Sequence, residues 1–177
     1  MEKIKVDNLS FSYPKSDKLA LDSVSLSIME SEFVVLCGKS GCGKSTLLRH
    51  LKKSMNPYGN KLGNVCFDGE EIEEMNDRDA ASKIGYVQQN PDNQLVTDKV
   101  WHELAFGLES LGYSNSVIKR RVAEMASYFG IQTWFRKSVS ELSGGQKQLL
   151  NLASVMAMQP EVLILDEPAS QLDPIAA

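Results

Sequence analysis

Hydrophobic and polar residues alternate along the first 30 residues of the chain. The alternation is clearest in Ile4-Lys5-Val6 and in Val24-Ser25-Leu26-Ser27-Ile28, and Tyr13-Pro14-Lys15-Ser16-Asp17 between them has the composition of a turn. A period of two residues is typical of strands that bury one face, and Pro, Ser and Asp are typical of turns. The pattern therefore predicts an antiparallel β-subdomain at the start of the chain.

The next segment combines an uninterrupted apolar run with a glycine-rich stretch. The run Phe33-Val34-Val35-Leu36-Cys37 predicts a strand buried on both faces, because it has no polar side chain to present to water. After the glycines, Lys44–Met55 places Leu47, Leu48 and Leu51 at helical spacing. We therefore expect a strand, a glycine loop and a helix in succession.

A second, amphipathic helix is predicted further along. Ile118, Val122, Met125 and Phe129 recur every three or four residues after a Ser/Asn-rich start, and Gly130 is suited to end the helix. The predicted fold class is therefore α/β with an inserted helical part. We assign the β-subdomain to residues 1–32, the α/β core to 33–92 and 141–177, and the helical subdomain to 93–140.

Composition narrows the class of protein. The chain has 177 residues, 42% of them hydrophobic and 24% charged, which is typical of one globular domain. A net charge of −4 argues against a nucleic-acid partner, since such proteins usually carry a basic face. No apolar stretch has the length of a membrane helix, and Met1-Glu2-Lys3 does not begin a signal peptide, so we expect a cytoplasmic location. Cys37, Cys42 and Cys66 lack disulfide or zinc spacing and are predicted to be free thiols.

The glycine-rich stretch matches the pattern G-x-x-x-x-G-K-[ST] of phosphate-binding loops. Its glycines allow a tight turn whose N–H groups point at phosphate oxygens, beside a helix N-terminus. Lys44 would reach the β- and γ-phosphates, and Ser45 would ligate Mg²⁺. A merely glycine-rich turn is disfavoured by the strand and helix predicted around it. The candidate phosphate-binding residues are Gly38, Lys39, Ser40, Gly41, Cys42, Gly43, Lys44, Ser45 and Thr46.

Two carboxylates follow the aliphatic run Val162-Leu163-Ile164-Leu165. The run predicts a parallel strand, and ligands of α/β sheets bind at the carboxyl ends of such strands. Asp166 can hold Mg²⁺ through a water molecule, and Glu167 is the better candidate to polarise the attacking water, because it is not tied to the metal. The alternative is an acidic helix cap after a core strand.

A second anion site is predicted at Leu142-Ser143-Gly144-Gly145-Gln146. Ser143 offers a hydroxyl, Gly144 and Gly145 leave N–H groups uncovered, and an apolar helical pattern begins here. Because one γ-phosphate does not need two cradles from one chain, Ser143–Gln146 is expected to serve the ATP of a second copy. The working unit would then be a dimer with two sites.

In this order and spacing, Gly38–Ser45, Leu142–Gln146 and Val162–Glu167 resemble the nucleotide-binding subunit of ATP-binding-cassette transporters, which has a P-loop NTPase core. The resemblance implies ATP and Mg²⁺ as ligands. It further implies that Tyr13 stacks on adenine, that Gln89 touches Mg²⁺ and the attacking water, and that Asp173 lies in the dimer-interface loop. For Tyr13 the alternative is a core aromatic, and Gln88 is the rival of Gln89.

Shorter strings, Phe11-Ser12-Tyr13-Pro14, Gln89-Asn90-Pro91-Asp92-Asn93-Gln94 and Ala105-Phe106-Gly107, resemble the energy-coupling-factor and cobalt-type importer ATPases. Such proteins hydrolyse ATP to take up vitamins or metal ions. The resemblance implies a second ATPase subunit, identical or different, and integral membrane transport subunits. It places the chain peripherally on the cytoplasmic face of the membrane, with no nucleic-acid partner.

Two departures from the family pattern affect these expectations. Ser31-Glu32 stands where Gly-Glu is usual, and the sequence stops at Ala177, before the family's γ-phosphate-contacting histidine. On this basis we expect a truncated cassette that binds Mg-ATP but has little hydrolytic activity alone. The alternatives are a cassette for nucleic-acid or ribosome work, disfavoured because no heptads separate Lys44 from Asp166, and a fragment that binds nucleotide without hydrolysing it.

Overall fold

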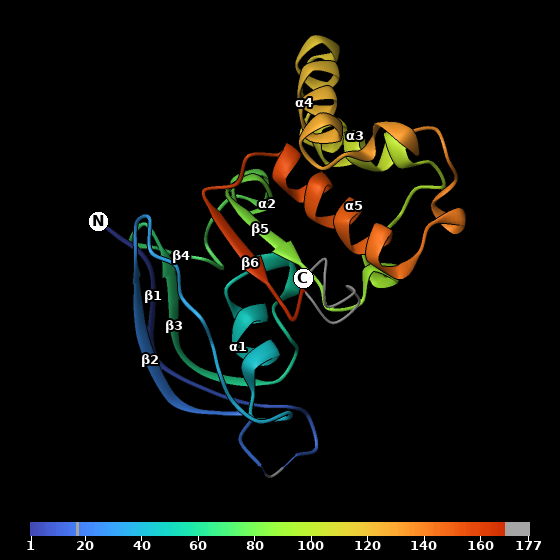
Figure 1. Ribbon diagram of the computed structural model, residues 1–177. Helices are drawn as coiled ribbons and strands as arrows, with labels where there is room; N and C mark the ends of the chain where they lie inside the picture. Colours follow the sequence, from blue (N-terminus) through green and yellow to red (C-terminus); the bar gives the residue numbers. More distant parts are fainter. Residues whose placement is uncertain (17, 169–177) are drawn as a thin grey trace. The chain divides into compact units, whose positions relative to one another are not determined.

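The computed structural model describes residues 1–16 and 18–168 and has two compact units, Met1–Ala81 and Ser82–Ala177 (Figure 1). The first contains an antiparallel sheet, and the second contains a parallel strand pair with helices. The predicted α/β class is confirmed. The finer division into residues 1–32, 33–92, 93–140 and 141–177 stays a prediction.

The sheet of the first unit has the strand order β2-β1-β3-β4, and its long strands run side by side in Figure 1. The strands are β1 (Glu2–Ser12), β2 (Leu21–Met29), β3 (Asn60–Phe67) and β4 (Glu70–Glu71), each antiparallel to its neighbour. The hairpin of the first two strands was predicted from the alternation. The other two strands were not.

An irregularity in β1 changes which residues face the core. Ile4 and Val6 are buried, but further along it is Leu9 and Phe11 that are buried, so the inward positions change from even to odd. The strand register shifts between these pairs, and Gly63 of β3 lies so close to β1 that a Cβ there would be 2.4 Å from the Asn8 carbonyl oxygen. This β-bulge lets both halves of β1 bury their apolar side chains.

The first unit also holds the short helix α1 (Lys44–His50), a 3₁₀ turn at Lys53–Met55, and the first residues of α2 (Asp77–Lys83). A continuous helix over Lys44–Met55 was predicted, but Lys52 has an extended backbone. Its buried ammonium donates to the carbonyl oxygens of Ala80 and Ala81, at 2.8 and 3.1 Å. These contacts with a distant segment favour the break after α1.

The predicted strand at Phe33–Cys37 is wrong. The segment forms neither a helix nor a strand, and the side chains of Phe33 and Val35 are 87% and 65% exposed. A strand is stabilised by the N–H and C=O groups of a neighbouring strand. Residues 1–16 and 18–168 supply no such neighbour for this run.

In the second unit β5 (Ile84–Val87) and β6 (Val162–Leu165) lie side by side and parallel (Figure 1). The helices are α3 (Val100–Ser110), α4 (Asn115–Tyr128) and α5 (Gly144–Ala157). The 3₁₀ turns are Pro91–Asn93, Ile131–Thr133 and Val139–Glu141. The amphipathic helix predicted from Ile118 to Phe129 is confirmed as α4, and Gly130 follows it with φ 65°.

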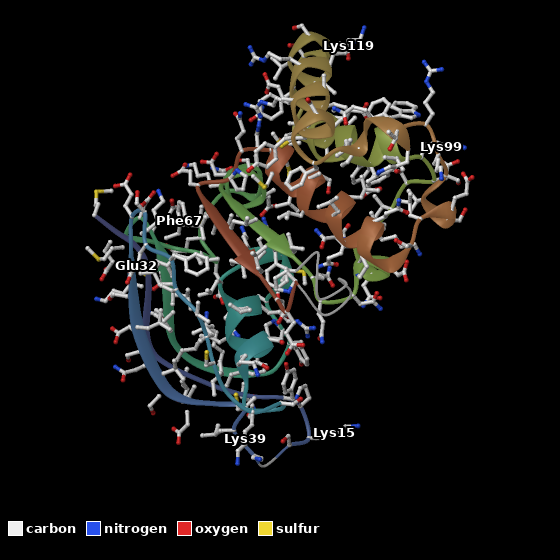
Figure 2. The ribbon with its side chains drawn as sticks, in the orientation of Figure 1. Lys15, Glu32, Lys39, Phe67, Lys99 and Lys119 are labelled. Carbon is white, nitrogen blue, oxygen red and sulfur yellow. The ribbon has the colours of Figure 1, made fainter. Side chains whose placement is uncertain are left out.

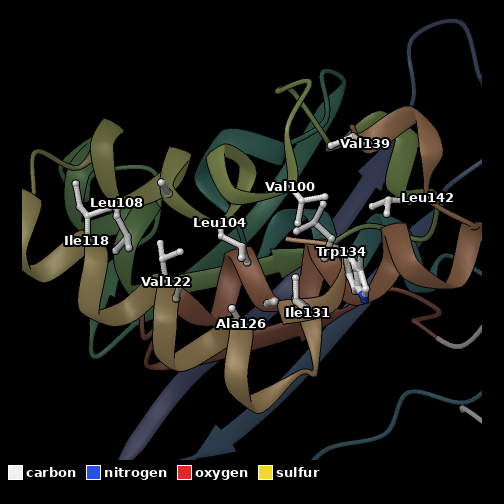
Figure 3. Close-up of a cluster of buried hydrophobic side chains, with 14 residues drawn as sticks. Val100, Leu104, Leu108, Ile118, Val122, Ala126, Ile131, Trp134, Val139 and Leu142 are labelled. Carbon is white, nitrogen blue, oxygen red and sulfur yellow. The ribbon is translucent and has the colours of Figure 1, made fainter. Parts of the chain in front are cut away.

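Helices α3, α4 and α5 share one apolar core, part of which Figure 3 shows. Leu104 and Leu108 of α3, Val122 of α4 and Leu150 of α5 are buried within it. Gly85 of β5 lies so close to α5 that a Cβ there would be 2.6 Å from Val155 Cγ1. Among the described residues, no helix has the length and apolarity needed to cross a bilayer.

Candidate functional site

The glycine loop of the first unit has the shape that a phosphate-binding loop needs. Gly41 and Gly43 have φ values of 78° and 98°, in the left-handed region that side chains disfavour. A Cβ at Gly43 would be only 2.4 Å from the Ala20 carbonyl oxygen, so no other residue fits there without a shift. Helix α1 begins at Lys44 with no side chain capping it, which leaves first-turn N–H groups able to bind an anion.

The Lys44 side chain turns back onto the loop. Its Nζ donates to the carbonyl oxygens of Gly38 and Lys39, at 2.9 and 3.2 Å. These bonds hold the positive charge beside the loop and use two of the three ammonium donors. Figure 2 shows Lys39 at the outer part of the loop, where its own side chain is exposed.

Tyr13 lies beside this loop and is bonded to it. Its hydroxyl is 3.0 Å from Thr46 Oγ1 of α1, and its ring meets the edge of Phe11 with centroids 4.9 Å apart. The residue follows the last residue of β1 and is 37% exposed, unlike the buried Phe11. The Tyr13 ring is thus partly exposed and bonded to α1, and its stacking on adenine stays a prediction.

His50 packs against Phe11, a contact that the sequence analysis did not predict. Its ring lies 4.7 Å from that of Phe11, and its Nδ1 is 2.7 Å from the Thr46 carbonyl oxygen. Burial is the main cause that lowers the pKa of His50, so the imidazole is neutral near pH 7 and donates from Nδ1. The signal in the sequence was that His50 lies four residues after Thr46 in the predicted helix, where its side chain can reach the Thr46 carbonyl oxygen.

In the second unit, the chain after β6 carries the two predicted carboxylates. Asp166 is only 5% exposed, and its Oδ2 accepts a 3.0 Å hydrogen bond from the Tyr86 hydroxyl of β5. Its backbone N–H donates to the Val87 carbonyl oxygen at 3.0 Å, which continues the parallel pairing. Tyr86 was missed in the sequence, although a lone tyrosine on a buried strand needs a partner for its hydroxyl.

Glu167 is exposed and paired with the other predicted catalytic residue. Gln89 Nε2 donates to Glu167 Oε2 at 2.6 Å, joining residues 78 positions apart. Glu167 has φ 47°, so the backbone turns sharply where the chain leaves β6. Of the two rival glutamines, Gln89 is the one whose side chain contacts Glu167.

The predicted second cradle forms the start of α5. Ser143 caps this helix: its hydroxyl accepts from the Gln146 N–H at 3.3 Å, and its own N–H donates to Gln146 Oε1 at 3.0 Å. The N–H groups of Gly144 and Gly145, in the first turn, have no intrahelical acceptor. They are suited to bind an anion, whereas the Gln146 N–H is already bonded. Asp173, also predicted, lies outside the described residues.

The sequence pattern of the family described as ABC transporter matches residues 21–170. The chain belongs to this family. The ABC-transporter match includes the phosphate loop, the Ser143–Gln146 cradle and the carboxylates after β6. It confirms the family predicted from these motifs.

The similarity to individual ABC proteins supports the same family assignment. The chain is 51% identical over 173 residues to a putative ABC transporter ATP-binding protein of Bacillus thuringiensis subsp. konkukian, covering 98% of this chain and 31% of the relative. It is 40% identical over 171 residues to the energy-coupling factor transporter ATP-binding protein EcfA1 of Ligilactobacillus salivarius, covering 97% and 60%. The chain thus spans 31% and 60% of the lengths of these two relatives.

A solved structure supports the same fold. CbiO1 of Clostridium perfringens, described as part of the ABC transporter complex CbiONQ, superposes with a TM-score of 0.82 at 32% identity, covering 99% of this chain and 69% of that one. The predicted P-loop NTPase fold and the likeness to energy-coupling-factor and CbiO-type ATPases are thereby confirmed.

Proposed function

We propose that this chain binds and hydrolyses ATP and thereby powers the uptake of a solute, a vitamin or a metal ion, through membrane partner proteins. Membership of the ABC family supports ATP as the substrate. The likeness to EcfA1, an energy-coupling factor transporter ATP-binding protein, and to a part of the ABC transporter complex CbiONQ supports transport as the process that hydrolysis drives.

The first unit supplies groups that bind the nucleotide. Phosphate oxygens accept from the N–H groups of the loop and of the first turn of α1, and Lys44 supplies a positive charge already directed at the loop. The Tyr13 ring stacks on adenine, held in place by Thr46 and Phe11. Binding in this manner orients the β- and γ-phosphates.

The second unit supplies groups for hydrolysis, and one observation carries this step: the 2.6 Å hydrogen bond from Gln89 to Glu167. The exposed Glu167 carboxylate accepts a proton from the attacking water, and Gln89 orients that carboxylate. A glutamate placed here only as a helix cap would not need such a partner. The pairing therefore favours a hydrolase over a protein that binds nucleotide without turning it over.

Mg²⁺ fits the residues that the family resemblance assigns to it. This ion is commonly held by one or two carboxylates together with substrate phosphates and water. Asp166 is a buried carboxylate oriented by Tyr86, and Ser45 and Gln89 offer neutral oxygens. No cluster of three or more His, Cys, Asp or Glu side chains suited to a metal occurs in residues 1–16 and 18–168. When bound, Mg²⁺ neutralises phosphate charge.

The Ser143–Gln146 cradle is proposed to bind the γ-phosphate of ATP held by a second ATPase subunit. The N–H groups of Gly144 and Gly145 and the Ser143 hydroxyl proton provide donors, and the dipole of α5 favours an anion there. Asp173 is proposed to lie in the same dimer interface. The dimer would act on the cytoplasmic face of the membrane, bound peripherally to integral membrane subunits.

Lys44→Ala tests the nucleotide site, in the protein at its natural full length. Charge-assisted hydrogen bonds contribute roughly 1.5–3 kcal/mol each, so we expect Mg-ATP affinity to fall by about 10- to 100-fold and hydrolysis to be abolished. Arg49→Ala removes an exposed cation from the same helix and serves as the matched control. Wild-type binding and turnover in Lys44→Ala would contradict the proposed site, and binding without turnover in the wild type would favour the non-catalytic alternative.

A further inference from the structure

The two edges of β5 are distinguished by its backbone hydrogen bonds. The carbonyl oxygens of Lys83 and Val87 accept from Glu161 and Asp166, at 2.8 and 3.0 Å, and so point toward β6. Backbone groups alternate between the two edges of a strand. The Tyr86 carbonyl and the Gln88 N–H therefore point away from β6.

The side chain of Gln94 bonds both of these outward groups. Its Oε1 accepts from the Gln88 N–H and its Nε2 donates to the Tyr86 carbonyl oxygen, each at 2.9 Å. A backbone amide of a neighbouring strand would offer the same donor and acceptor. The carboxamide thus pairs with the end of β5 on either side of Val87, as a further strand would.

We propose that Gln94 is a positioning residue: by fixing the end of β5, it places Gln89 where it can bind Glu167. This inference rests on the proposed function, in which Gln89 orients the catalytic carboxylate. Gln89 directly follows the bonded residue Gln88, and both Gln89 and Glu167 are exposed. A hydrogen bond between exposed side chains stabilises its own geometry weakly, so the backbone beneath Gln89 must supply the order.

Other contacts hold the same turn to α5. Gln148 Nε2 donates to the Gln88 carbonyl oxygen at 3.3 Å, and Lys147 Nζ forms a 2.6 Å ion pair with Asp92. Those contacts join the turn to the helix that starts at the Ser143 cradle. The Gln94 bonds are different, because they connect the turn to β5 itself and so to Tyr86, whose hydroxyl binds Asp166. Gln94 thereby fixes the backbone of β5 directly before Gln89.

The experiment compares Gln94→Met with Gln94→Glu, both in the protein at its natural full length. Methionine has similar length and makes neither bond, whereas glutamate can accept from the Gln88 N–H but cannot donate to Tyr86. Asn93→Ala, at the exposed preceding position, is the matched control. The measurements are amide hydrogen exchange at Gln88, Mg-ATP affinity, and kcat for hydrolysis.

For Gln94→Met we expect amide exchange at Gln88 to become about tenfold faster and kcat about tenfold slower, because both partly buried Gln94 hydrogen bonds are lost. Mg-ATP affinity should fall by less than kcat does, because the phosphate loop is untouched. Gln94→Glu should retain part of the Gln88 protection and lose kcat. Asn93→Ala should match the wild type in all three.

Any of three results for Gln94→Met would overturn the positioning role of Gln94. These are unchanged amide exchange at Gln88, unchanged kcat, and a loss of Mg-ATP affinity equal to the loss of kcat. If Gln94→Met does not fold, the same three outcomes are judged on Gln94→Glu. Failure of the proposed function is distinguished by the Glu167 variants. If Glu167→Gln hydrolyses ATP like the wild type, the proposed function fails; if Glu167→Gln loses hydrolysis and Gln94→Met does not, only the positioning role of Gln94 fails.

Discussion

Replacement of Glu167 by glutamine separates the charge of this side chain from its shape. Glutamine has nearly the same size and still offers an oxygen to Gln89 Nε2, now 2.6 Å from the carboxylate. It cannot accept the proton of the attacking water. We therefore expect Glu167→Gln to bind Mg-ATP normally and to hydrolyse it far more slowly.

The two effects differ enough in size to be told apart. The pair is exposed, so exchanging its charge-assisted bond for a neutral one should cost under about 1 kcal/mol of stability. General-base catalysis contributes roughly 10²- to 10⁴-fold, or about 3–5 kcal/mol of activation free energy. The increase in the activation free energy of hydrolysis should therefore be several times larger than any decrease in the free energy of unfolding.

The assay measures single-turnover hydrolysis and Mg-ATP affinity for the wild type, Glu167→Gln and the double variant Gln89→Glu/Glu167→Gln. The double variant restores a carboxylate–amide hydrogen bond with its direction reversed. It should recover the pairing but not the rate, because the carboxylate then occupies position 89. Glu124→Gln, which removes an exposed carboxylate 3.8 Å from Arg120, is the matched control.

Three results would refute this reasoning. Unaltered hydrolysis in Glu167→Gln would assign the proton acceptor to another group. Wild-type hydrolysis in the double variant would show that either position can supply the base. A loss of ATP affinity as large as the loss of rate would mean that Glu167 acts in binding.

Two further predictions concern a thiol and a buried ammonium. Cys42 is exposed, and its Sγ lies 2.7 Å from the position that a Cβ on Gly38 would occupy. Mg-ATP at ten times its Kd should therefore slow maleimide labelling of Cys42 by about tenfold. Equal labelling with and without nucleotide would place Cys42 outside the site. Burial lowers the pKa of Lys52 from 10.5 to about 8, so between pH 7.5 and 9.5 the folded state releases this proton before the unfolded state does. The free energy of unfolding should therefore gain up to about 2 kcal/mol over this range, and urea unfolding of Lys52→Met should lack the gain while Lys53→Met keeps it; identical pH dependence in Lys52→Met would contradict the assignment.

Local signals were enough to predict the elements that local interactions determine. Helix α4 has a regular apolar period and ends at Tyr128, two residues before Gly130, and both features are independent of distant residues. The phosphate loop was equally predictable, because Gly43 is required by backbone geometry that the motif itself encodes. The bulge that changes the inward positions of β1 depends on Gly63, a residue of another strand, and could not be seen in a two-residue period.

The support of the candidate site depends on contacts between distant positions. Tyr86 and Asp166 are 80 residues apart, and nothing in either segment specifies the other as its partner. Gln94 lies near Gln88 in sequence, but its role requires that β5 have one edge turned away from β6. Motifs were therefore enough to propose the reacting groups, whereas the contacts of the side chains proposed to orient them could be seen only in the fold.

The exposed run Phe33–Cys37 has a consequence for how the protein behaves in concentrated solution. It presents apolar side chains, Phe33 87% exposed among them, and has no strand partner in the described part of the chain. Such a segment can pair with the same segment of another molecule and start an intermolecular sheet. Raising the protein concentration should therefore favour self-association through this run, and a partner that covers the run should reduce it.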